Sequence, residues 1–247
     1  MTEIFIYDGS FEGFLSAVFE AYQRKKEPAD IATSDGVQLA IGAELVHIVT
    51  DTQKAQRLVT GMEKSGNFAG VVMSAFLSHM HGRELLIFKY IVLGFKVKGK
   101  IHSMTGDDTV AKVLDMSRQT LREVHKLSGF LRFSVMENQL MYAEISPKNN
   151  VLTLLMPHFT DRMRGLPFII NDLIYRQLGV YDTKSWYTRT SEGLTLPNYH
   201  PDERHYRQMW KCFYDTIAID GRENHALRQQ LMPKRYHKHL TELIELE

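Results

Sequence analysis

Cysteine is almost missing from the sequence, because Cys212 is the only one among 247 residues. A single cysteine excludes a disulfide framework, a cysteine zinc site and an iron–sulfur cluster built within one chain. Long hydrophobic runs are missing too: no stretch approaches the roughly 18 apolar residues of a membrane span, and the start, MTEIFIYDGS, does not resemble a signal peptide. We therefore expect a soluble cytoplasmic protein that neither enters a membrane nor holds a metal or cofactor.

Standard catalytic signatures are also missing. The sequence has no G-x-S-x-G elbow, H-E-x-x-H pair, Walker sequence or C-x-x-C pair. Cys212 lies in the apolar segment WKCFYD, which favours a buried structural thiol over a nucleophile. The sequence does not decide whether the protein is an enzyme.

Charge is nearly balanced over the chain, at +1, but arginine and histidine are concentrated in its second part. Residues 101–247 hold twelve of fifteen Arg and eight of eleven His, whereas Lys is divided eight to seven. The planar guanidinium of arginine suits phosphates and base edges, so this asymmetry favours recognition of an anion. Eighteen acids offset nineteen bases in the same part, which leaves an ordinary solvated surface as the alternative.

The hydrophobic pattern predicts an α+β fold that is rich in helices, with antiparallel β-hairpins and helices packed on one side. Residues 1–105 form an N-terminal strand, helix and helical part, and residues 106–247 form an Arg/His-rich α+β part, either separately or as one continuous unit. In the first part we expect strands at 3–7 and 44–50, a connection at 27–36, and helices at 11–25, 52–65, 67–80 and 83–95. The second part should begin with a helix at 108–127 and a hairpin formed by 130–136 and 140–145. An apolar helix interrupted by Pro157, a strand pair within 168–182, a helix from Pro201 and a short helix before Pro233 should follow.

The helix at 108–127 carries a basic stripe of Arg118, Arg122, His125 and Lys126. Such a stripe can contact a backbone of phosphates, or it can be a solvated helix face.

The segment HFTDRMRG places His158, Asp161, Arg162 and Arg164 close together at the end of an apolar run. His158 and Arg162 are four residues apart and share a helix face. The group can be a phosphate clamp or an acid/base site, or a polar helix end with an ion pair of Asp161.

The segment GRENHALRQQLMPKRYHKHL, residues 221–240, has five Lys or Arg and three His around one Glu. Alternating cations and an aromatic ring in Lys234, Arg235 and Tyr236 suit contact with a nucleic acid. A basic helix end is the ordinary alternative. A metal site at His237 and His239 is a weaker interpretation, because no carboxylate stands at ligand spacing.

The chain resembles a bacterial family of unknown function described as "probable DNA metabolism protein". The similarity runs through FIYDGSFEGFLSAVFEAY, LSGFLRFSVMENQLMYAEISPKNNVLTLLMPHFTDRM and MWKCFYDTIAIDGRENHALRQQLMPKRYHKHLTE. The positions that match are Tyr7, Asp8, Gly9, Gly129, Phe130, Arg132, His158, Phe159, Arg162, Trp210, Lys211, Arg222, Asn224, Pro233 and Tyr236.

The resemblance implies an accessory DNA-binding protein in DNA repair or modification that presents DNA to, or partners, a radical-SAM enzyme. Such an enzyme carries its cluster cysteines in its own chain. We expect DNA to contact Arg118, Arg122, Lys126, Arg132, His158, Arg162, Arg164, Lys211, Arg222, Asn224, Lys234, Arg235 and Tyr236, with Phe130, Phe133 or Tyr236 stacking on bases.

Two alternatives stay open. The protein can itself be a glycosylase or nuclease, in which His158, Asp161 or Asp172 acts on a water. It can also be a protein-interaction module without DNA affinity.

Overall fold

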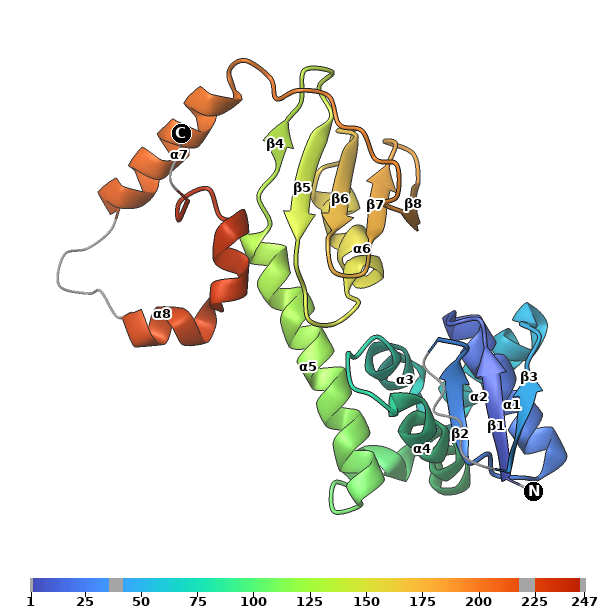
Figure 1. Cartoon of the computed structure of the whole chain (residues 1–247). Coiled ribbons are helices and arrows are strands. Elements are labelled where there is room, and N and C mark those ends of the chain that lie inside the picture. The colour runs from blue at the N-terminus through green and yellow to red at the C-terminus, as the bar shows by residue number, and fades with distance from the viewer. Residues whose placement is uncertain (1, 36–41, 218–224, 245–247) are drawn as a thin grey trace. The chain divides into compact units, whose positions relative to one another are not determined.

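The computed structural model describes residues 2–35, 42–217 and 225–244, and the chain divides into two compact units, residues 1–121 and 122–247. The sequence placed the division at residue 105, in the turn before a long helix. The structure places it inside that helix, α5 (Asp108–Phe130), which begins in one unit and ends in the other (Figure 1). Each unit has a sheet of its own, and the predicted α+β class is confirmed.

The sheet of the first unit has three strands, β1 (Thr2–Tyr7), β2 (Asp30–Thr33) and β3 (Ala43–His47). Both neighbours of the central β1 run parallel to it. β1 and β3 confirm the predicted strands, but β2 lies where we expected a connection. Its four residues bury only Ile31, so its own pattern is too short to indicate a strand, and pairing with β1 decides its conformation.

The helix α1 (Phe11–Arg24) begins where the sequence predicts, because Ser10 caps it. The Ser10 hydroxyl accepts a hydrogen bond from the Gly13 N–H at 2.9 Å, which satisfies one of the free donors of the first turn. The Asp8 carboxylate in turn accepts bonds from the hydroxyls of Ser10 and Thr50, at 2.6 and 2.7 Å. The ends of β1 and β3 are thereby joined.

Three helices and a 3-10 turn complete the first unit: α2 (Thr52–Gly66), α3 (Ala69–Phe76), α4 (Arg83–Val97) and η1 (Lys98–Ser103). They confirm the predicted helices to within a few residues. Fully buried aromatic rings such as Phe5, Phe14, Phe68 and Tyr90 fill its core.

The sheet of the second unit has five strands in the order β4-β5-β6-β7-β8. They are β4 (Ser134–Val135), β5 (Met141–Ile145), β6 (Phe168–Asp172), β7 (Gln177–Tyr181) and β8 (Trp186–Thr190). The hairpins β4–β5 and β6–β7 are antiparallel as predicted, while β5 and β6 are parallel. The edge strand β8 was not anticipated, because all five of its residues are exposed and show no buried side.

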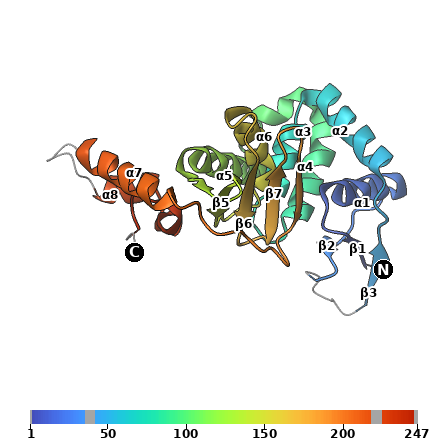
Figure 2. The same ribbon diagram turned by 90° about the horizontal axis from the view of Figure 1, so that it is seen from above.

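The helix α6 (Leu152–Arg162) packs on this sheet, and Figure 2 shows it beside β6 and β7. We expected Pro157 to interrupt the helix, but α6 continues through it. The free energy gained by burying Leu152, Leu155, Met156 and Phe159 in the core of the unit exceeds the cost of the helix hydrogen bond that is missing at the proline.

The C-terminal elements are α7 (Glu203–Ile217), α8 (His225–Leu231) and the 3-10 helix η2 (Lys234–His239). They confirm the long helix after Pro201 and the short helix before Pro233. In the part of the chain that the structure describes, no helix is both long and apolar enough to cross a membrane.

Candidate nucleic-acid interface

The basic stripe of α5 is exposed. Asp107 begins the helix by accepting a hydrogen bond from the Val110 N–H at 3.0 Å, and Val113 and Leu127 are buried on its apolar side. Arg118 and Arg122 are exposed on another side. Arg118 lies 3.9 Å from Asp115, an exposed ion pair that stabilises the helix little, so its charge is accessible to a ligand.

The C-terminal segment joins this stripe from the far end of the sequence. Lys126 Nζ donates a hydrogen bond to the Gln230 carbonyl at 3.3 Å, and the Arg235 guanidinium donates one to Glu123 at 2.9 Å. Figure 1 shows α8 and η2 near the C-terminal half of α5. We define the basic surface as Arg122, Lys126, Lys234 and Arg235. Three of these four side chains are exposed and Lys126 is half-buried.

Glu123 is the buried anchor of the basic surface, with its side chain 4% exposed. Its carboxylate accepts hydrogen bonds from the Lys148 and Asn149 N–H groups and from the Tyr236 hydroxyl, at 2.9, 2.8 and 2.6 Å. Burial opposes ionisation, but these donors and Arg235 hold the pKa of Glu123 below its ordinary value. Glu123 therefore stays ionised and fixes η2 against α5.

The aromatic residues proposed for base stacking lie largely inside the protein. Tyr236 is 1% exposed, and Phe130 packs against its ring. Phe133 makes edge contacts with Phe159 and Phe168 in the core. Tyr236 is therefore not available to stack on a base, because the alternation of residues along the chain does not reveal which side of an element is covered. Phe130 and Phe133 are half-buried, and stacking by either of them stays a prediction.

Arg132 is held within the fold. Its guanidinium donates to both carboxylate oxygens of Glu242, at 3.3 and 2.7 Å, and lies 5.4 Å from the centre of the Trp210 ring. Trp210 Nε1 donates to the same carboxylate at 2.9 Å. Arg132 thus connects the start of the sheet to α7 and the C-terminal turn, and its charge is matched inside the molecule.

The group on α6 is exposed and forms no enclosed site. His158, Asp161, Arg162 and Arg164 are all exposed, and Arg164 pairs with Asp161. This arrangement allows contact with phosphate. It matches equally well the alternative interpretation, a polar helix end with an ion pair of Asp161.

Asp172, the third catalytic candidate, is fully buried at the end of β6. Its Oδ1 accepts hydrogen bonds from the Ile174 and Tyr175 N–H groups, at 2.9 and 3.0 Å, and so shapes the turn to β7. Burial, with Glu123 adding to it, raises the pKa of Asp172 from 3.8 to about 6. A fully buried carboxylate cannot meet a DNA substrate, whereas His158 and Asp161 are on the surface.

The two histidines of η2 make separate contacts. His237 Nε2 lies 3.1 Å from the Met232 carbonyl, and His239 Nε2 lies 2.9 Å from the Ser146 hydroxyl. The two imidazole rings therefore bind different groups of the protein. Two of the predicted DNA contacts in this segment, Arg222 and Asn224, lie outside the described residues.

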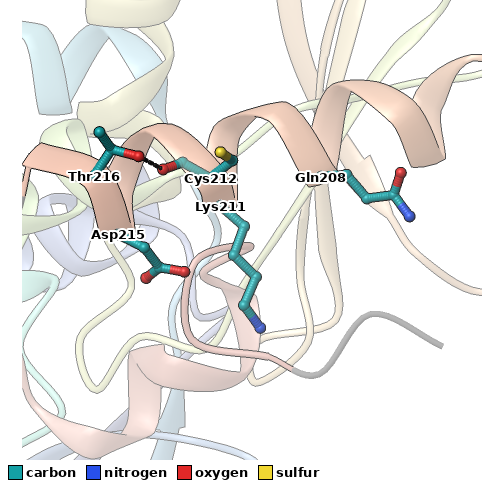
Figure 3. Close-up of a pocket in the computed structure, with 5 residues that line it drawn as sticks. All are labelled: Gln208, Lys211, Cys212, Asp215 and Thr216. Atoms are coloured by element: carbon teal, nitrogen blue, oxygen red, sulfur yellow. Dashed lines mark hydrogen bonds between the residues drawn. The ribbon is translucent and has the colours of Figure 1, made fainter.

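Cys212 is exposed, so the expectation of a buried thiol is wrong. Figure 3 shows it with Gln208, Lys211, Asp215 and Thr216 along α7, where these residues line an open hollow of about 490 Å³. Lys211 Nζ donates to the Ile244 carbonyl at 3.1 Å. The apolar face of α7 is exposed as well, and consists of Tyr206, Met209, Trp210, Phe213 and Ile217.

Sequence reasoning missed a second group of polar residues, beside the β4–β5 hairpin. A cleft of about 160 Å³ is lined there by residues that include Tyr142, Glu144, Tyr199, Arg207 and Lys238. The available signals were the spacing of Glu203 and Arg207, four residues apart on one helix, and the alternation that places Tyr142 and Glu144 on the same side of β5. Neither signal shows that these segments meet.

A model of the DUF4130 family, described as a domain of unknown function, matches residues 81–242, which is well over half of the chain. The chain belongs to this family. The DUF4130 region includes α5, the whole five-stranded sheet and the basic surface, and no curated protein matches the chain. The resemblance to a family of unknown function is thus confirmed, while its DNA-metabolism description and its radical-SAM companion stay predictions.

Proposed function

We propose that this protein binds DNA phosphates through the basic surface, as an accessory protein in DNA repair or modification that presents DNA to a radical-SAM enzyme. The observation that carries the DNA-binding part is that α5 and the C-terminal segment meet through the Lys126–Gln230 and Arg235–Glu123 hydrogen bonds. Basic residues from two segments more than a hundred positions apart are thereby brought near one another. The repair context and the partner are supported by the sequence resemblance alone.

The charge on this surface suits a polyanion better than a single acid. Glu123 neutralises part of the charge of Arg235, but Arg122 and Lys234 are exposed and remain free to meet successive phosphates. Lys126 keeps its charge while donating to a carbonyl. Contacts of this kind release counterions from DNA and position it without reading its sequence.

The test is fluorescence anisotropy of labelled single-stranded and duplex DNA at several salt concentrations. The double variant Arg122→Glu with Lys234→Glu should weaken binding at least about tenfold and flatten the dependence on salt, because two phosphate contacts become repulsive. A matched control is Lys64→Glu with Lys96→Glu, two exposed lysines of the first unit that change the net charge equally. Equal losses in both variants, or no binding by the unaltered protein at low salt, would contradict the proposal.

A second candidate function is protein interaction without DNA affinity, and the exposed apolar face of α7 favours it. Side chains this large are usually covered when they line one side of a helix. Here Phe213 is 52% and Ile217 is 57% exposed. The radical-SAM protein would be the partner that α7 contacts.

Co-purification with that partner separates the two functions. If docking is the function, capture should survive nuclease treatment and Arg122→Glu, and should be lost in Phe213→Ser. Capture that nuclease abolishes would instead indicate that DNA bridges the two proteins.

A further inference from the structure

The cleft beside β4 and β5 lies on the side of the sheet that faces away from α6. Ala143 and Ile145 of β5 belong to the core around α6, and the alternation along a strand directs Tyr142 and Glu144 to the opposite side. Tyr199 lies in the loop before α7, Arg207 lies on α7, and Lys238 comes from η2. Four segments of the second unit therefore meet around one concave space.

The base of this cleft carries an ordered chain of hydrogen bonds. Asn171 Nδ2 donates to the Tyr142 hydroxyl at 2.8 Å, and that hydroxyl donates to Glu144 Oε1 at 2.8 Å. Asn171 is 7% and Tyr142 is 4% exposed, so the chain is fixed by its surroundings. It holds the Glu144 carboxylate in place as an acceptor for N–H groups of a ligand.

A flat surface and a cation complete the lining. The Arg207 guanidinium lies 4.7 Å from the centre of the Tyr199 ring, and it is held there by Glu203 at 2.9 Å and the Ser134 hydroxyl at 2.6 Å. The Tyr199 ring remains half exposed. Lys238 is exposed, and among the described residues its amine has no hydrogen bond or ion pair.

We propose that this cleft binds a single unpaired nucleotide, with its base against Tyr199 and Arg207, a base N–H group on Glu144, and its phosphate on Lys238. The inference rests on the proposed DNA-binding function and extends it by naming the unit that is recognised. Aromatic and guanidinium planes stack on any base, carboxylates accept from base amines, and ammonium groups bind phosphate as point charges.

The size of the cleft agrees with one small ring. A cavity of about 150 Å³ is enough to hold benzene, and this cleft measures about 160 Å³. A paired base is stacked within a duplex and cannot enter such a space. Single-stranded or extruded nucleotides are therefore the form of DNA that fits.

The experiment compares dCMP, deoxyribose 5-phosphate and inorganic phosphate as ligands by calorimetry, and single-stranded with duplex DNA by anisotropy. The unaltered protein should bind dCMP more tightly than either reference ligand. Tyr199→Ala should remove that preference and lower the affinity for single-stranded DNA about fivefold or more, while Tyr199→Phe should keep both. Lys238→Ala should weaken dCMP and deoxyribose 5-phosphate alike.

Matched controls are Tyr187→Ala and Lys184→Ala, which alter an exposed tyrosine and lysine away from the cleft. Both should leave dCMP binding unchanged. Thermal unfolding of each variant shows whether the fold is retained, and Lys238→Ala tests the cleft at an exposed position if Tyr199→Ala does not fold.

The outcomes separate the cleft from the basic surface. Equal affinity for dCMP and for the two reference ligands overturns the nucleotide cleft, even when the Arg122 and Lys234 charge reversals abolish duplex binding. Binding of dCMP that depends on Tyr199, in a protein with no affinity for DNA of either form, supports the cleft and overturns the proposed DNA-binding function.

Discussion

Gly94 lies inside α4, where a helix normally favours alanine by about 1 kcal/mol. Here an added Cβ would come within 2.6 Å of the Phe68 ring, which is fully buried and held by edge contacts with Tyr90 and Phe95. The clash outweighs the helix preference, so Gly94→Ala should destabilise the protein by about 1–3 kcal/mol. Urea denaturation measures the change.

Gly70 provides the matched control for that substitution. It lies in α3 with nothing within 4 Å of the added Cβ, so Gly70→Ala should be neutral or slightly stabilising. Equal effects at the two positions would show that Phe68 is free to move.

Asp172 makes stability depend on pH in the direction opposite to a salt-bridged carboxylate. Its pKa is raised from 3.8 to about 6, so the folded state retains a proton that the unfolded state has released between these values. The protonated Asp172 therefore favours the folded state fully below about pH 4, and this stabilisation is lost as the pH rises through 6. The loss has an upper limit of about 3 kcal/mol.

The substitution Asp172→Asn removes this dependence while keeping an acceptor for the two turn N–H groups. It should be nearly neutral at pH 4.5 and stabilising by about 1–2 kcal/mol at pH 8, because the buried charge is gone but the new amide needs a partner. Denaturation curves at the two pH values provide the measurement. A variant that is equally destabilised at both would rule out the charge as the cause.

Single residues also show where sequence reasoning is limited. The cap at Ser10 could be predicted, and the cap of α5 could be narrowed to Asp107 or Asp108, because each cap depends on neighbours three residues away. The burial of Tyr236 and the exposure of Cys212 were not, because each depends on whether a distant segment covers that side of the chain. At both positions the prediction from the neighbouring residues in the sequence was wrong.

At the scale of elements, Glu123 holds α5, the loop at 146–150 and η2 together. Glu123→Ala removes the acceptor of the buried Tyr236 hydroxyl and the partner of Arg235, so it should cost about 3–5 kcal/mol. Amide hydrogen exchange of η2 should accelerate more than that of β6 and β7. Uniform acceleration throughout the second unit would show that Glu123 acts on the whole unit.

The Glu123 carboxylate also determines how strongly acid destabilises the contact between α5 and η2. Because the pKa of Glu123 is lowered in the folded state, its contribution is present above its ordinary pKa and is lost as the pH falls through the lowered value. Glu123→Gln should therefore flatten the decline of stability in acid, which denaturation below pH 5 would show.

Elements were predictable in proportion to their length and periodicity. The helices α1, α2 and α5 carry strong repeats of apolar residues, and the sequence predicted each of them. The strands β2 and β8 have four and five residues and owe their conformation to a neighbouring strand. The meeting of α5 with η2 has no local signal at all, which is why the basic surface could be predicted only as two separate segments.

On the scale of the whole molecule, a net charge of +1 means that DNA affinity depends on where charge is placed. Four phosphate contacts by the basic surface predict that a fourfold rise in salt weakens binding on the order of 100-fold. Since such contacts carry no sequence information, duplexes of different sequence should bind equally. Anisotropy titrations of several duplexes check both expectations, and a strong sequence preference would contradict them.

The single cysteine gives the molecule a chemical handle. Because Cys212 is exposed on α7, a maleimide dye should attach at one known position in the unaltered chain, with no need to remove other thiols. Trp210 lies two residues away on the same helix, so the distance between the two does not change when α7 moves, and the anisotropy of the dye is the signal to follow. A rise in that anisotropy when DNA or a partner protein is added would show that α7 is in or near the contact.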